Sequence, residues 1–258
     1  MAILFKLAVF KNSFVLSKHL LLSVFFSFYS FIALSNDNLD KARNFFLKGE
    51  YEKAIQEAST YNNADAKILH SRILSIYTHF YIKDQSSEEM FLKAYKIAKA
   101  AIEIAPENDE AHVEAAHALG RYGQKIGIMA AITKGVAERV RKYLNKALDI
   151  NPNNILANLS KGIWHAEIIN QAGKTLAGAV YGAKIEKAVY HFDKVETHRN
   201  SNEIGVLFEL AYGYSLLNEG VYFKKSKVLI ERLLKVKISS DMDSVYKKKA
   251  LSLLEILP

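Results

Sequence analysis

Apolar residues recur at every third and fourth position along most of the chain, and strand-like alternation never persists beyond a few residues. Such spacing is typical of amphipathic helices. One clear stripe within 91–104 consists of Ala94, Ile97, Ala98, Ala101 and Ile104. Pro106 ends this helix, because the residue before a proline is pushed out of helical geometry. The pattern therefore predicts an all-α protein.

The sequence also repeats itself at a spacing of 46 residues. Segment 99–120 matches segment 145–166 at four pairs of positions, namely Ala101 with Ala147, Pro106 with Pro152, Ala111 with Ala157 and Ala116 with Gly162. Internal repetition of this length indicates stacked helix pairs. We predict five antiparallel pairs, over 38–62, 64–106, 109–152, 155–200 and 203–237, and a C-terminal capping helix over 241–257.

Two of the predicted units contain glycine-rich insertions between their helices, over 120–135 and 170–183. They hold seven of the 12 glycines and are apolar and nearly uncharged. Gly127 and Gly173 lie 46 residues apart, so the two insertions are related. We expect lengthened helices or ordered glycine-rich turns that pack together on one side of the solenoid. Two hypotheses stay open: a pocket or partner surface built by both insertions, and a structural pad in which they bury each other.

The second helices resemble those of the tetratricopeptide repeat (TPR) family, whose signature places Ala, a large apolar residue, Ala and Pro at steps of four, three and five. The best match is Val140, Leu144, Ala147 and Pro152. The resemblance covers about 39–237 and implies a right-handed TPR-like solenoid with a concave binding surface. Within that family the chain is similar to exported proteobacterial proteins related to the periplasmic component of TRAP-type transporters. It is also similar to the helical domain of regulators of microtubule dynamics. None of these resemblances supplies catalytic residues.

Residues 1–35 have the order of a secretory signal. They contain lysines but no acidic residue, and an apolar run over 20–34 ends in small residues at a predicted cleavage point after Ser35. The run is short for a membrane-spanning helix. We therefore predict a signal peptide, an exported helical domain over 36–258 and a periplasmic location. The alternative is an uncleaved signal that anchors the protein to the inner membrane.

Composition narrows the chemistry further. The chain has no Cys, which excludes disulfides, thiolate metal sites and cysteine nucleophiles. Its net charge of +8 falls to +5 without residues 1–35, because 32 Lys and Arg then face 27 Asp and Glu. This modest surplus is typical of solvated helix faces, and we expect no nucleic-acid partner. Gly173-Lys174-Thr175 lacks the rest of a phosphate-binding loop, and we expect no cofactor.

Candidate site residues come from the repeat positions and the insertions. Arg121 and Glu167 lie 46 residues apart on successive first helices, where they predict either an ion pair or part of a concave site. In the second case, an acidic or carboxylate-bearing ligand would contact the side chains of Arg121, His117, Trp164 and His165. Trp164 is favoured as a core anchor, and Tyr122 and Tyr181 are better candidates for a pocket lining.

These residues do not predict a metal site, since His112 and His117 are five positions apart and do not share a helix face. A cross-helix metal site from His117, His165 and Glu167 is the weaker alternative. The sequence favours a non-enzymatic adaptor or scaffold in the bacterial envelope that binds a protein or peptide partner. The alternative is a periplasmic carrier of a small apolar or carboxylate ligand held by the two insertions.

Overall fold

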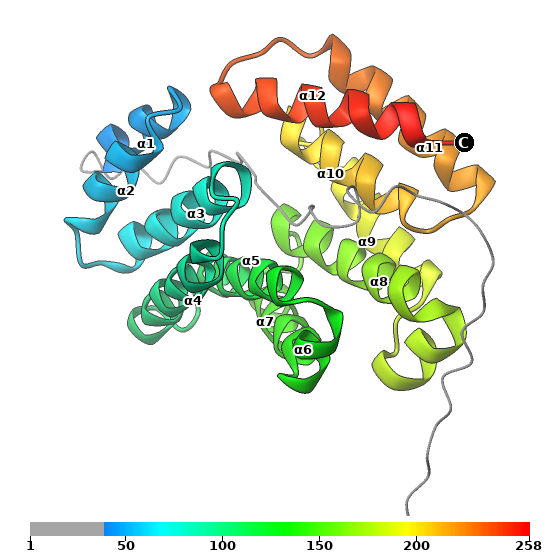
Figure 1. Cartoon of the computed structure of the whole chain (residues 1–258), viewed down its shortest axis with the longest axis horizontal. Coiled ribbons are helices and arrows are strands. Elements are labelled where there is room, and N and C mark those ends of the chain that lie inside the picture. Colours follow the sequence, from blue (N-terminus) through cyan, green and yellow to red (C-terminus); the bar gives the residue numbers. More distant parts are fainter. Residues whose placement is uncertain (1–38) are drawn as a thin grey trace, which may run out of the picture.

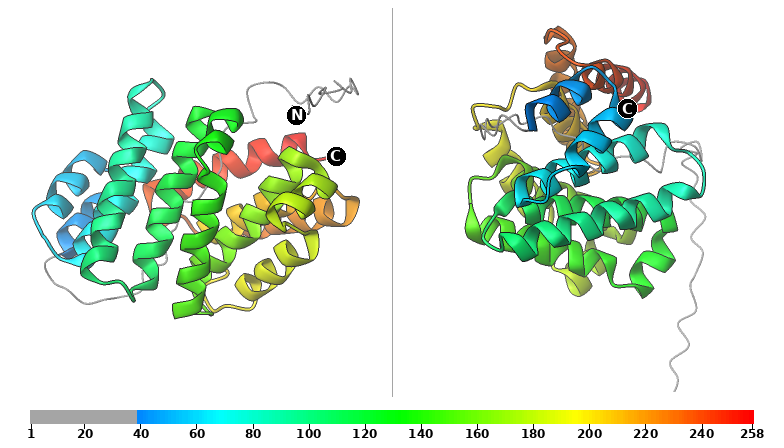
Figure 2. Two further views of the ribbon diagram at one scale, coloured as in Figure 1. Left: turned by 90° about the horizontal axis from the view of Figure 1, so that it is seen from below. Right: turned by 90° about the vertical axis from the view of Figure 1, so that its left-hand side faces the viewer.

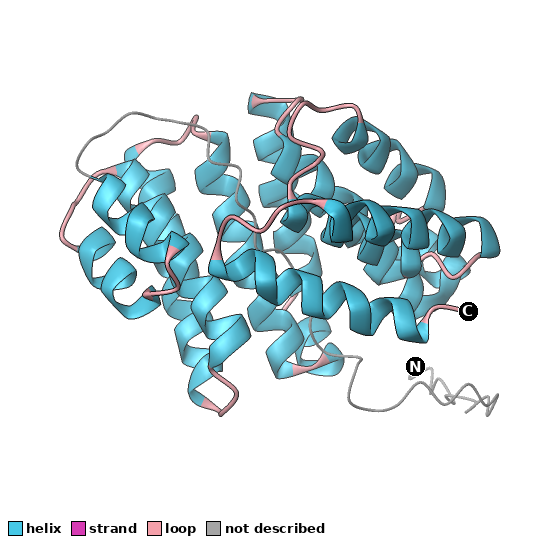
Figure 3. Ribbon diagram, turned by 90° about the horizontal axis from the view of Figure 1, so that it is seen from above, coloured by secondary structure: helices cyan, strands magenta, loops and turns pink. Residues whose placement is uncertain are grey.

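The computed structural model describes residues 39–258, so the signal segment predicted over 1–35 lies outside the described residues. The described part contains helices and connecting loops but no strand (Figure 3). Its elements are α1 (Asp40–Leu47), α2 (Tyr51–Ser59), α3 (Ala64–Tyr81), α4 (Ser86–Ile104), α5 (Asp109–Ile126), α6 (Ile128–Thr133), α7 (Val136–Ile150), α8 (Ile155–Leu176), the π-helical turn η2 (Ala177–Tyr181), α9 (Ile185–Glu196), α10 (Ile204–Ser215), α11 (Gly220–Lys235) and α12 (Asp241–Ile256).

These helices form the five predicted pairs and the predicted C-terminal helix. The pairs are α1 with α2, α3 with α4, α5 with α7, α8 with α9, and α10 with α11 (Figure 1). Neighbouring helices pack against one another along the chain, as the side views in Figure 2 show. The prediction of an all-α, solenoid-like fold is confirmed.

An asparagine begins the first helix of each of the three central pairs. The side-chain oxygen of Asn63 accepts a hydrogen bond from the backbone of Ala66 at 2.8 Å. Asn154 does the same for Ala157, also at 2.8 Å, and Asn108 caps α5 in the same way. Each cap satisfies one of the amide groups that a helix N-terminus leaves without a partner. A local signal in the sequence therefore fixes where each first helix begins.

The two insertions have the same backbone design. Gly127 (φ 83°, ψ 161°) separates α5 from the short helix α6, and Gly173 (φ 74°, ψ 155°) breaks α8 in the same way. The geometry of Gly127 and Gly173 is essentially restricted to glycine. A left-handed glycine follows in each insertion: Gly135 (φ 61°) is the N-cap of α7, and Gly182 (φ 64°) ends η2 shortly before α9. Both insertions therefore combine additional helical residues with ordered glycine turns.

Side chains from both insertions share one hydrophobic cluster, which we call the insertion cluster. Its buried members include Tyr122 and Val136 from the first insertion region and Ala177 from the second, with Trp164 between them. Tyr181 packs against the cluster from η2. The insertions therefore contribute side chains to one common hydrophobic cluster, which also contains Trp164.

The C-terminal helix α12 packs back against the N-terminal part of the solenoid, where it contacts α2 and α3. The Asp241 carboxylate accepts hydrogen bonds from the hydroxyls of Tyr51 at 2.9 Å and Tyr81 at 2.8 Å. The Tyr246 ring meets the Phe80 ring edge-on at 5.8 Å. Helix α12 therefore caps the last pair and also joins it to the first two pairs, beside which its start lies in Figure 1.

Phe192 on α9 fills a notch between two glycines, Gly162 on α8 and Gly213 on α10. A Cβ atom added to Gly162 would overlap the Phe192 ring, and one added to Gly213 would lie 2.5 Å from it. Phe192 is completely buried, so the ring has little room to move. The small residue predicted at position 162 is therefore required by this helix crossing.

We predict that Gly162→Ala lowers the free energy of unfolding by about 1–3 kcal/mol, because an overpacked core forces its neighbours to shift. Urea unfolding followed by circular dichroism measures the change. Gly220→Ala is the matched control, since a Cβ atom there meets nothing within 4 Å. Equal losses of stability in the two variants would contradict the overlap at Phe192.

Candidate functional site

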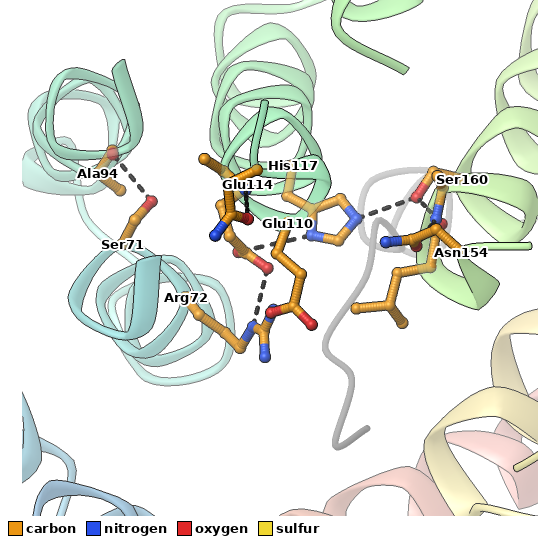
Figure 4. Close-up of polar contacts among 12 residues, drawn as sticks. Ser71, Arg72, Ala94, Glu110, Glu114, His117, Asn154 and Ser160 are labelled. Carbon is orange, nitrogen blue, oxygen red and sulfur yellow. Dashed lines mark hydrogen bonds and ion pairs between the residues drawn. The ribbon is translucent and has the colours of Figure 1, made fainter. Parts of the chain in front are cut away.

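A line of buried and half-buried polar side chains joins the first helices of three successive pairs (Figure 4). Arg72 on α3 donates from Nε to the Glu114 carboxylate at 2.8 Å and from a terminal nitrogen to Glu110 at 3.0 Å. His117 Nδ1 lies 3.6 Å from the same Glu114 carboxylate. His117 Nε2 is 3.0 Å from the hydroxyl of Ser160 on α8. We call this set the interior polar chain.

Electrostatics hold the interior polar chain in its ionised form. Burial raises the pKa of the Glu114 carboxyl, but Arg72 and His117 more than offset this and bring the pKa to about 2. Burial lowers the pKa of Arg72, whereas its two carboxylate partners outweigh that effect and raise the pKa above the ordinary value. The pair is charged at neutral pH, and its partners belong to different helices. The chain therefore ties helix pairs together.

Arg121 is more deeply buried than Arg72 and lies on the part of α5 that faces α10 and α12. It is 1% exposed, and burial lowers its pKa to about 10 against the opposing influence of Glu209 on α10, Tyr246 on α12 and Glu114. The predicted ion pair with Glu167 is wrong, because the carboxylates that influence Arg121 are Glu209 and Glu114. The curvature of the fold brings α10 toward α5 and thereby supplies Glu209, whereas Glu114 belongs to α5 itself.

Glu167 has its own partner on the next first helix. Its carboxylate accepts a hydrogen bond from the Tyr212 hydroxyl of α10 at 2.7 Å. Burial raises the pKa of Glu167 to about 7, although hydrogen bonds from Tyr212 and Gln171 act in the opposite direction. A proton therefore binds to Glu167 near neutral pH in the folded protein.

Trp164 of α8 and Tyr181 of η2 lie together in the layer formed with α7. The Trp164 indole is 2% exposed and donates to the Ala137 carbonyl at 3.0 Å, as a core anchor does. Its ring centroid is 6.5 Å from the Tyr181 ring. Two cations lie over the same indole, Lys161 at 5.0 Å and Arg141 at 5.9 Å.

His165 is next to Trp164 and stacks on His191 of α9, with the ring centroids 6.1 Å apart. Burial and the positive charge of Lys161 lower the pKa of His165 to about 3. Burial, with Lys161 and other lysines, lowers the pKa of His191 to about 4. Burial lowers the pKa of Lys161 itself to about 8, with Arg141 and Lys187 acting in the same direction. Both histidines are neutral at pH 7, and this region carries a surplus of positive charge.

The predicted site residues therefore separate into three places. His117 and Arg121 face the interior, and Glu167 pairs with Tyr212. The remaining residues belong to the outer layer or the insertion cluster beside it: Tyr122, Trp164, His165 and Tyr181. The single concave ligand site expected from Arg121, His117, Trp164 and His165 does not form. His117 and Arg121 of α5 face α8, α10 and α12 in the interior, whereas Trp164 and His165 of α8 contact α7 and α9.

The alternative metal site fails for the same reason. Within residues 39–258, no three His, Asp or Glu side chains converge in a way that could hold a metal ion. The sequence interpretation also missed Arg72, Lys161 and Arg141. The signal for Lys161 was present, since positions 161, 164 and 165 share one helix face. Arg72 carried no comparable signal, because its partners lie about 40 residues away.

Fold and contacts define the class of this protein: a helical scaffold of stacked pairs, closed by its last helix, with an outer layer rich in cations. The family model "RMD1-3: Regulator of microtubule dynamics protein 1-3" matches residues 38–257, so the chain belongs to that family. A search of curated protein sequences gives no match to the chain. The family description indicates a protein-interaction or regulatory role.

The family match corrects the sequence analysis. The assignment to the TPR family and to relatives of the TRAP-transporter component was wrong, whereas the similarity to regulators of microtubule dynamics is confirmed. The TPR-like spacing has a general cause: stacked helices need small residues at their close crossings, as Ala147 and Gly162 show. Such spacing therefore indicates the fold and does not identify the family.

The length and hydropathy of the described helices decide whether any of them could span a membrane. Among the helices of residues 39–258, none has both the length and the apolar character needed to cross a membrane. The export prediction rests on residues 1–35 alone and stays a prediction.

We predict that Arg72→Met lowers the free energy of unfolding by about 3–5 kcal/mol, because it leaves the Glu114 carboxylate buried without its main counter-charge. Chemical denaturation at pH 7 measures the loss. Lys146→Met is the control, since Lys146 pairs with Glu107 at the surface and such pairs contribute under about 1 kcal/mol. Adding Glu114→Gln to Arg72→Met should restore part of the stability. Losses of similar size at Arg72 and Lys146 would refute a structural role for the interior polar chain.

Glu167 gives a pH-dependent prediction. Its folded-state pKa of about 7 lies above the ordinary value of 4.5, so its contribution to stability is complete below pH 4.5 and is lost as the pH rises through 7. Glu167→Gln stays neutral, so its stability relative to wild type should rise by roughly 3 kcal/mol between pH 4.5 and pH 8. Urea unfolding at both pH values tests this. Glu231→Gln, at an exposed position, should show no such trend, and a flat difference for Glu167→Gln would exclude the raised pKa.

Proposed function

We propose that this protein is a non-enzymatic interaction protein that regulates a protein partner by binding it. The family description supports a regulatory role. The interior polar chain supports the non-enzymatic part, because Arg72, Glu114 and His117 bind one another across helix pairs. Ionisable groups used in this way hold the scaffold together and are not free to act on a substrate.

The observation that carries the proposal is a set of exposed apolar side chains on the insertions. Ile132 at the end of α6 is 51% exposed, Leu176 at the end of α8 is 54% exposed and Val180 in η2 is 61% exposed. We call these three residues the insertion surface. Helix α6 and the segment formed by the end of α8 and η2 both lie at the lower edge of the molecule in Figure 1.

Residues next to the insertion surface are packed into the hydrophobic insertion cluster. Ala131 beside Ile132, and Ala177 and Tyr181 beside Val180, pack into the insertion cluster. Apolar side chains fixed in place on a packed base are typical of protein docking surfaces, because little conformational entropy is lost on binding. The packing of the cluster by its own side chains favours a partner on the outside over a small ligand held between the insertions. We therefore propose a protein partner instead of the small-ligand carrier.

A photo-reactive amino acid placed at Val180 tests this proposal in living cells. We expect a discrete protein adduct from position 180. The matched control is Val228 on α11, which is 60% exposed but lies outside the insertions. An adduct of the same size from both positions, or none from position 180, would contradict docking at the insertion surface. Mass spectrometry of the adduct identifies the partner.

A further inference from the structure

Five side chains from three helices meet in the outer layer next to the second insertion. Helix α8 contributes Lys161 and His165 on the face that also carries Trp164, α7 contributes Arg141, and α9 contributes Lys187 and His191. We call Arg141, Lys161, Lys187, His165 and His191 the cation cluster. Trp164 holds it together, because Lys161 and Arg141 lie over its indole ring and His165 meets the ring edge-on at 5.0 Å.

The cation cluster is adjacent to the insertion surface. Arg141 donates from Nη1 to the Tyr181 carbonyl of η2 at 3.4 Å. Tyr181 also contacts Trp164 through its ring and directly follows Val180 in the chain. A segment that docks on the apolar insertion surface therefore continues directly onto the cation cluster.

Two buried nitrogens of this cluster have no hydrogen-bond partner within the described residues. They are His165 Nδ1 and Arg141 Nε. The His165 side chain is only 3% exposed, so water does not readily replace a missing partner. Lys161 is 7% exposed and donates to the Asn145 amide oxygen at 2.7 Å, which leaves further ammonium hydrogens for a second acceptor. The cluster therefore offers unused donors.

The charge at this place is also incompletely balanced. The neighbouring cations Arg141 and Lys187 lower the pKa of Lys161, and the nearby Glu138 carboxylate raises it. Glu138 already forms an ion pair with Arg141 at 2.7 Å, and both side chains are partly exposed. One carboxylate thus faces three cations. Two neutral histidines add hydrogen-bond capacity without adding charge, since burial and the nearby lysines keep their pKa values low.

We propose that the cation cluster binds a carboxylate side chain from an acidic segment of the protein partner. Within this proposal, which rests on the proposed function, Arg141 and Lys161 supply the positive charge, and Lys161 donates one of its remaining ammonium hydrogens to the carboxylate. Trp164 and Tyr181 form the wall toward the insertion surface. The partner segment is then acidic where it meets α7–α9 and apolar where it meets Ile132, Leu176 and Val180.

Trp164 provides a direct readout, because it is the only tryptophan of the chain. The purified full chain is titrated with a synthetic decapeptide of alternating Glu and Gly and with the matched peptide of alternating Gln and Gly. We expect a saturable change of Trp164 fluorescence with the Glu peptide alone. Raising the salt concentration from 50 to 300 mM should weaken the binding several-fold, as expected for charge pairing.

Variants separate this site from general attraction between charges. Arg141→Met and Lys161→Met should each raise the dissociation constant about ten-fold, whereas Lys146→Met on the same helix α7 should change it by less than about two-fold. Arg141 is partly exposed, so its variant tests the site independently of any effect of Lys161→Met on folding. Equal losses for Arg141 and Lys146 would overturn the proposal.

Two further outcomes would also decide against it. Equal binding of the Gln peptide would exclude a carboxylate as the recognised group. A fluorescence change produced by inorganic phosphate at lower concentrations than by the Glu peptide would assign the site to a phosphate group. A failed peptide titration together with a Val180 adduct refutes only the carboxylate site. The absence of that adduct refutes the proposed function.

Discussion

The buried pair of Arg72 and Glu114 is the contact on which the arrangement of this scaffold depends. It joins α3 to α5, and His117 extends the connection to α8 through Ser160. Charges buried this deeply are stable only in the company of their partners, so the first helices must stay in register. With these helices fixed on the inside, the second helices and the insertions are left to form the outer layer.

Helix α8 has a separate role on each of its sides. Ser160 and Glu167 contact the neighbouring first helices, whereas Lys161 and His165 face the second helices α7 and α9. One helix therefore belongs both to the internal framework and to the surface proposed for partner binding. A partner that contacts the outer side touches a helix whose inner side is fixed by hydrogen bonds to α5 and α10.

The fold was largely predictable because its signals are local and repeated. Apolar spacing, the prolines at 106 and 152 and the glycines of the insertions act within a few residues of their own positions. Those signals predicted all five pairs and the last helix. They could not identify the family, because the small residues at positions such as Ala147 satisfy a packing requirement that unrelated stacked-helix proteins share.

The sequence by itself determined where helices begin and end, that they form stacked pairs, and that Gly127 and Gly173 mark equivalent breaks. The tertiary structure alone decided which side chains meet. Arg121 faces Glu209 and Glu114 instead of Glu167, and α12 reaches back to Tyr51 and Tyr81. The physical reason is curvature: small rotations between successive pairs accumulate over the solenoid, and no local pattern in the sequence records where they bring distant residues together.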